Sequence, residues 1–151
     1  MKHHHFLLLV HLVGVIVWVG GMAFAHFCLR PSALQLPPAQ RLTLWHGVFG
    51  RFFPIVWAAL AAIGLSGFAI LVEVGFAQAP RSWHLMAGFG LVMMAIFVSI
   101  WFGPWQALKA AVAVESWAQG AQALNAIRQR VTVNLVLGAL TVVLATVGLA
   151  F

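Results

Sequence analysis

Few side chains in this sequence could bind a metal ion or carry a proton, and most of them are histidines. The chain contains seven histidines, five methionines, one cysteine and two carboxylates. Imidazole suits copper, zinc and iron, whereas the thioether of methionine suits Cu(I). The single cysteine, Cys28, excludes an intramolecular disulfide and a metal site of the CxxC type. These residue types indicate a metal or haem site.

His11 lies inside a strongly apolar stretch, HLVGVIVWVGG (residues 11–21). On a helix it shares a face with Gly14, Trp18 and Gly21 through the i, i+3, i+7 spacing. Small residues on such a face let a neighbouring helix or a flat cofactor approach the backbone. Because ionisable groups inside a membrane usually face a site or a partner, His11 is predicted to be a ligand or a proton carrier. The alternative is a neutral imidazole that is hydrogen-bonded to a neighbouring carbonyl or tryptophan.

The chain starts with MKHHH, which offers a second way to bind copper. A free amino terminus with a histidine in third place chelates Cu(II) through the amine, the intervening amides and the imidazole of His3. The alternative is a histidine run with no role in the protein.

Composition decides the class of protein that must position these groups. Of the 151 residues, 64% are hydrophobic and only 7% are charged, whereas a soluble domain carries about a quarter charged residues. The chain is therefore expected to be an integral membrane protein in contact with the lipid bilayer. Its net charge of +6 comes from scattered basic residues that form no cluster, so nucleic-acid binding is not expected.

Four stretches are long enough to cross a bilayer as helices, which takes roughly 20 apolar residues each. They cover approximately residues 6–28, 52–72, 83–103 and 131–151. Two further segments are predicted to be interfacial helices: residues 40–51 and residues 107–128. The first of them follows a proline pair that interrupts helical structure. The expected fold is all-α, an integral membrane four-helix bundle that forms a single transmembrane domain over residues 1–151.

The distribution of basic residues predicts the orientation. Lys2 and Arg81 lie on the side of the termini, whereas the first and third loops hold six basic residues: Arg30, Arg41, Arg51, Lys109, Arg128 and Arg130. The positive-inside rule places these two loops in the cytoplasm. In a bacterial inner membrane both termini then face the periplasm. Four tryptophans near the cytoplasmic boundary are typical of interfacial residues: Trp45, Trp101, Trp105 and Trp117.

No catalytic residues are predicted. The two carboxylates, Glu73 and Glu115, fall on opposite sides of the membrane in this topology and cannot act as an acid–base pair. The sequence also has no phosphate-binding loop or dinucleotide fingerprint. An enzymatic activity is therefore not the favoured interpretation.

The topology gathers candidate metal ligands in or near the periplasmic half of the bundle: His3, His11, Glu73, His84 and Met86. The expected order of ligands follows the reduction of Cu(II) to Cu(I). Imidazole and carboxylate lie at the water-exposed surface, and thioethers lie deeper in the membrane. Met86 and Met93 are the candidates for passing copper inward. The alternative for these methionines is a role as core filler.

Haem b is the alternative cofactor. Helix bundles often hold a cofactor between facing helices, and histidines are common axial ligands of haem iron. His11 with His84 would hold one haem near the periplasmic side, and His26 with His46 another near the cytoplasmic side. Such a protein would carry electrons across the membrane. A third alternative is a structural subunit without a site.

Three segments resemble the copper-resistance protein D (CopD/PcoD) family. They are HLVGVIVWVGGMAFAHFCLRPSAL (residues 11–34), LWHGVFGRFFPIVWAALAAIGLSGF (44–68) and WHLMAGFGLVMMAIF (83–97). The resemblance implies a bacterial inner-membrane protein of copper uptake or tolerance that works beside a periplasmic copper-binding protein. The chain resembles the four-helix domain of the family without the extra helices of longer members. The sequence leaves the formation of a homo-oligomer open.

A more distant resemblance is to the HemJ-type haem-binding membrane proteins. It rests on the pattern His11, Trp18, Gly21 and Phe24 in the first predicted span. This resemblance implies bound haem b. The arginine of that pattern comes later here, at Arg30, and no lysine lies inside a predicted span.

Overall fold

The structure, a computed structural model, describes residues 2–147 and consists of helices joined by short connections. No strand occurs within those residues, and four helical arms are long and apolar enough to cross a membrane. The predicted all-α membrane fold is confirmed. The last four residues of the predicted fourth span, 148–151, and Met1, whose amine was a predicted copper ligand, lie outside the described part.

The first arm is a nearly unbroken helix from His3 to Ala33. It consists of α1 (Lys2–Phe24), a π-helical turn (Ala25–Leu29) and α2 (Arg30–Ala33). The N–H of Arg30 donates to the carbonyl of Ala25, five residues back, which is the wider hydrogen-bond pattern of a π-helix. The arm is longer than the predicted span 6–28 at both ends.

The second arm, α3 (Pro38–Val74), is a single helix of 37 residues. It begins where Pro37 is extended and Pro38 occupies the first turn, a position at which the missing N–H of proline costs nothing. It ends at Gly75, whose φ of +86° suits glycine. The segment 40–51, predicted to be a separate interfacial helix, is therefore continuous with the second span. At 1.5 Å per residue, α3 is about 55 Å long and exceeds the roughly 30 Å hydrocarbon core.

The remaining helices are α4 (Arg81–Phe102), α5 (Pro104–Ala113) and α6 (Trp117–Val147). Gly103 interrupts the helix between α4 and α5. Glu115, with a φ of 55°, lies in the turn before α6. The predicted segment 107–128 is thus divided: its first part belongs to α5, and the rest is the start of α6, which continues into the fourth span.

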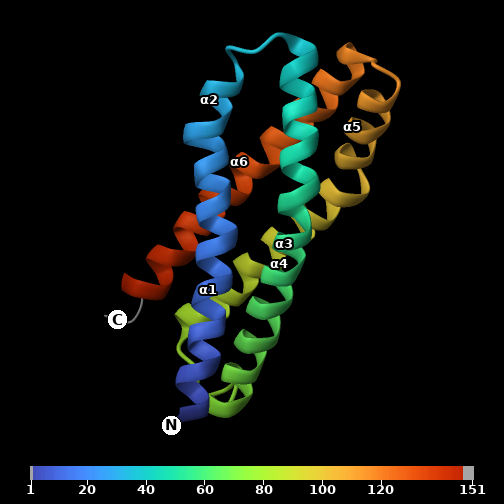
Figure 1. Ribbon diagram of the computed structural model, residues 1–151. Coiled ribbons are helices and arrows are strands. Elements are labelled where there is room, and N and C mark those ends of the chain that lie inside the picture. The colour runs from blue at the N-terminus through green and yellow to red at the C-terminus, as the bar shows by residue number, and fades with distance from the viewer. Residues whose placement is uncertain (1, 148–151) are drawn as a thin grey trace.

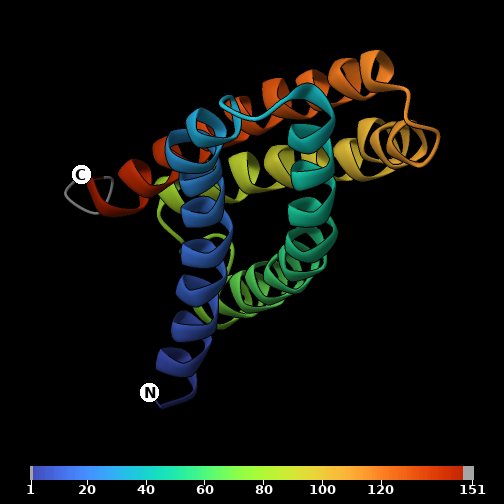
Figure 2. The same cartoon turned by 45° about the horizontal axis from the view of Figure 1, so that its top comes forward.

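The helices pack as two pairs that cross. α1 packs along α3, α4 packs along α6, and α6 folds back along α5, whereas α3 and α4 meet mainly through aromatic side chains. Figures 1 and 2 show the α4–α6 pair running obliquely across the α1–α3 pair. α1 and α3 are antiparallel, so the first turn of α1 meets the last turn of α3.

The densest packing lies towards the end of the molecule that carries the α2–α3 and α5–α6 connections. Trp45, Phe49 and Phe53 repeat every four residues on one face of α3, and their rings form a ladder with centroid distances of 4.9 Å. Phe97 of α4 and Trp105 of α5 meet Phe53 edge-on at 5.4 and 5.3 Å. Trp45 and Trp105 are only 2% and 4% exposed. Their rings fill the core and do not lie on the lipid-facing surface where interfacial tryptophans are usual. Their position near the cytoplasmic boundary stays a prediction.

Candidate functional site

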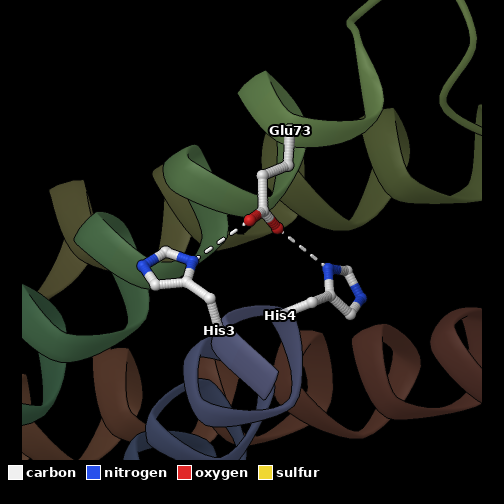
Figure 3. A network of polar contacts seen from close by, with 3 residues as sticks. All are labelled: His3, His4 and Glu73. Carbon is white, nitrogen blue, oxygen red and sulfur yellow. Dashed lines mark hydrogen bonds and ion pairs between the residues drawn. The ribbon is translucent and has the colours of Figure 1, made fainter. Parts of the chain in front are cut away.

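Three polar side chains meet where the first turn of α1 touches the last turn of α3. The Nδ1 atoms of His3 and His4 lie 3.1 and 3.0 Å from the two carboxylate oxygens of Glu73. Figure 3 shows the two imidazoles on opposite sides of the carboxylate. We call His3, His4 and Glu73 the N-terminal cluster. All three are at least one-third exposed, so the cluster is accessible from outside the protein.

The helices explain why these residues meet although about 70 positions separate them. Successive residues of a helix project about 100° apart, so His3 and His4 can flank one group between them. Glu73 stands next to the last residue of α3, at the negative end of the helix dipole, which favours a nearby cation. Exposed ion pairs contribute little to stability. Anchoring of the helices is therefore a weak explanation for the cluster.

The spacing within the cluster suits pairs of metal ligands. Two ligands about 2.0–2.1 Å from one tetrahedral metal lie about 3.3 Å from each other, which is close to both histidine–carboxylate distances. Each imidazole faces a different oxygen, however, so the three groups do not enclose a common point. Within residues 2–147, no set of three or more histidine, cysteine, aspartate or glutamate side chains forms a ready metal site. A metal would require one imidazole to swing across or a further ligand to arrive.

His11 faces α3 and not the lipid. Its Nδ1 lies 3.2 Å from the carbonyl oxygen of Ile63 and 3.2 Å from Oγ of Ser66. Gly67 makes room for the ring, because a Cβ there would lie 3.1 Å from the ring Cε1. The bond to Ile63 is of the kind that the alternative prediction for His11 described. When Nδ1 donates to that carbonyl, the neutral ring keeps Nε2 free to accept a metal or a proton.

Glycines set the distance between α1 and α3, as the sequence predicted for the face that carries His11. A Cβ on Gly14 would lie 2.8 Å from the side chain of Ile63, and a Cβ on Gly21 would overlap the ring of Phe52. The predicted small-residue face is therefore the face on which the two helices pack.

The other candidate ligands lie apart from the cluster. His84 is exposed and its Nε2 donates to the carbonyl of Phe76 across the α3–α4 connection, at 3.0 Å. Met86 is half-buried in the second turn of α4. Met93 is 3% exposed and packs against Gly138 of α6. Among the described residues, no hydrogen bond or ion pair joins His84 to His11 or Glu73.

The histidines proposed for a second haem have separate surroundings. Nδ1 of His26 lies 3.5 Å from Oγ1 of Thr132 on α6, whereas the ring of His46 stacks on Trp105 with centroids 5.5 Å apart. In the described part of the chain, no hydrogen bond or ring contact links His26 with His46 or His11 with His84.

Sequence reasoning missed His4 as a partner of Glu73. The available signal was the adjacency of His3 and His4, which lets both reach one carboxylate, and the antiparallel order of the first two spans. Sequence reasoning named His3 and Glu73 as ligands and included His4 only as one of the N-terminal histidines.

Together these features define a multi-pass membrane protein with histidines and a carboxylate where its first two long helices meet. The sequence profile of the family CopD, copper resistance protein D, matches residues 46–148, about two thirds of the chain. The chain belongs to this family, as the sequence predicted. No curated protein matches the chain, and no solved structure does. No comparison supports the more distant resemblance to HemJ-type proteins.

The family match begins at His46 and therefore leaves out α1 and α2. It includes Glu73 and His84, but not His3, His4 or His11. The case for the N-terminal histidines thus rests on geometry.

Proposed function

We propose that this copper-resistance membrane protein binds copper directly and takes part in its uptake or tolerance, with the N-terminal cluster as the entry point. The observation that carries the proposal is the convergence of two imidazoles on one carboxylate, at 3.0 and 3.1 Å, on an accessible surface. Imidazole is a good ligand for copper, and the family supplies the link to that metal.

Copper would replace the protons that now link the imidazoles to the carboxylate. Metal ligands must be deprotonated, so binding releases protons and weakens as the pH falls. A Cu(II) ion held by one imidazole and one oxygen of Glu73 would need one rotation of the second imidazole to gain a third ligand. Helix ends with exposed side chains permit such a rotation at low cost.

His11 is the next ligand along the same seam between α1 and α3. His4 and His11 are seven residues apart on α1, so they share a face about 10 Å apart along the axis. Glu73 and Ser66 have the same spacing on α3, and Ser66 is the residue that His11 contacts. Copper leaving the cluster would meet the free Nε2 of His11 as its next ligand. His84 and Met86 are on α4, outside the seam between α1 and α3, and would serve as accessory ligands.

The positive-inside argument assigns the N-terminal cluster to the periplasmic side of a bacterial inner membrane. Copper would then arrive from the periplasm, delivered by a periplasmic copper-binding protein. The exposed position of the cluster is compatible with such a transfer.

Copper binding can be tested on full-length protein purified in detergent. After incubation with Cu(II) and removal of free metal, we expect about one bound copper per chain by elemental analysis. Glu73→Gln keeps the size of the side chain but removes its charge, and should lower copper retention about tenfold. Glu115→Gln, which alters the other carboxylate of the chain, is the matched control and should retain copper fully.

Two further results separate the alternatives. Extending the chain by several residues at its N-terminus removes the amine chelate of His3 but leaves the N-terminal cluster, so retained binding supports the cluster. A Soret band in the purified protein, with no copper bound after loading, would replace the proposal with the haem alternative.

A further inference from the structure

A small pocket lies at the opposite end of the molecule from the N-terminal cluster, between the π-helical turn, α3 and α6. It has a volume of about 20 Å³, enough for one water-sized group. Its walls include three side chains with N–H donors, His26, Arg30 and Arg128, and the indole of Trp45. We call it the arginine pocket.

Two of the residues that line the pocket carry buried donors that the protein does not satisfy. Nε and Nη2 of Arg128 and Nε1 of Trp45 are buried and have no hydrogen-bond partner in the described part of the chain. Trp45 is 98% buried, given its 2% exposure, and the guanidinium carbon of Arg128 lies 5.4 Å from the centre of its ring. Buried donors without acceptors are costly, above all on a charged group. An acceptor from outside the chain would remove this cost.

The charge around the pocket is also uncompensated. Arg30 and Arg41 are close enough for their charges to act on that of Arg128. Within residues 2–147, the ion pairs are those of Glu73 with His3 and His4, at the other end of the molecule. No carboxylate within the described residues therefore neutralises the three arginines.

We propose that the arginine pocket binds a phosphate group. Arginine offers a planar fork of N–H donors that matches two oxygens of a phosphate. The pocket has room for one phosphate oxygen, so the other oxygens would stay outside it. The side chain of Arg128 would have to rotate to bring its buried N–H groups to that oxygen. His26 lies on the wall because the π-helical turn, marked by the bond from Arg30 to Ala25, inserts an extra residue there. π-helical turns often occur at functional sites.

The phosphate could belong to a phospholipid headgroup or be free in solution, and the surroundings favour the headgroup. Phe24 and Phe27, on the same helical arm as Arg30, are 60% and 69% exposed and offer an apolar surface for acyl chains. Basic pockets between membrane helices on the cytoplasmic side bind anionic lipid headgroups, and the cytoplasm is the predicted side for Arg30 and Arg128.

The test compares full-length protein in nanodiscs of phosphatidylcholine alone with nanodiscs that also contain phosphatidylglycerol. We expect phosphatidylglycerol to raise the thermal midpoint of unfolding by several degrees, and native mass spectrometry to retain about one phosphatidylglycerol per chain. Inorganic phosphate is titrated into the phosphatidylcholine sample as a second arm. If inorganic phosphate stabilises the protein and phosphatidylglycerol does not, the bound group is the free ion and not a headgroup.

Arg128→Gln should abolish the shift. Trp45→Phe keeps an aromatic ring, although a smaller one, but removes the N–H donor, and should reduce the shift by more than half. It also serves as the test if Arg128→Gln does not fold. Arg51→Gln makes the same change of charge at an exposed position of α3 and should leave the shift intact. The proposal is overturned if neither lipid nor phosphate stabilises the protein, or if Arg51→Gln reduces the shift as much as Arg128→Gln.

Discussion

At the scale of single residues, the structure gives each buried histidine or glycine of α1 a specific neighbour on α3. His11 is fixed by contacts with Ile63 and Ser66, and its ring lies against Gly67. The sequence predicted that His11 faces a partner helix, because an imidazole is costly in lipid. It did not predict which atoms the ring would meet, since those depend on the register of α1 against α3.

A glycine substitution tests this contact. Gly67→Ala should destabilise the protein by about 1–2 kcal/mol, because the new methyl group would push the ring of His11 away from its two acceptors. Gly64→Ala, three residues earlier on α3, meets only the end of Met94 at 3.9 Å and should be neutral or stabilising. Thermal unfolding in detergent measures both. Equal effects of the two variants would contradict the packing of His11 on Gly67.

At the scale of helices, the aromatic ladder of α3 holds the two crossing pairs together. Phe53 contacts Phe49 on its own helix, Phe97 on α4 and Trp105 on α5. The periodicity of four residues along α3 was visible in the sequence, but an apolar helix offers similar residues on every side. Contact with α4 and α5 decided which face became the core.

Phe53→Ala should therefore cost about 3–5 kcal/mol, the usual range for removing a buried aromatic ring. Phe68→Ala is the matched control, because Phe68 lies on the same helix but is 63% exposed, and it should cost much less. Denaturation in mixed micelles gives both values. If Phe68→Ala proves as harmful as Phe53→Ala, the core is not where the structure places it.

At the scale of the whole molecule, two regions of different chemistry lie towards opposite ends of the crossed helix pairs. The N-terminal cluster lies at one end, and the arginine pocket lies beside the aromatic core near the other. Between them, many large apolar side chains of all four arms are exposed, as expected of surfaces that face lipid. A metal entry point and an anion site at opposite ends are compatible with one molecule that spans the bilayer.

The orientation of the molecule is testable with variants that carry a single introduced cysteine. Cys28 is the only cysteine of the chain, so Cys28→Ser gives a background without thiols. In that background, Gln78→Cys in the α3–α4 connection should react with a membrane-impermeant maleimide on intact cells. Val114→Cys, in the α5–α6 connection, should react only after the membrane is opened. The reverse pattern would place the N-terminal cluster in the cytoplasm and refute entry of copper from the periplasm.

The sequence by itself determined the class of this protein, the number of its long apolar segments and the position of His11 on a glycine-lined helical face. These follow from composition and from a spacing of 3.6 residues per turn, which are local properties. The tertiary structure alone decided that α3 runs unbroken through a predicted interface, that Trp45 and Trp105 are core residues, that His4 joins His3 at Glu73, and that Arg128 meets Trp45. Each of these outcomes depends on which faces of which helices pack together. Apolar membrane helices associate through close packing, and this packing joins chain segments that are distant in sequence.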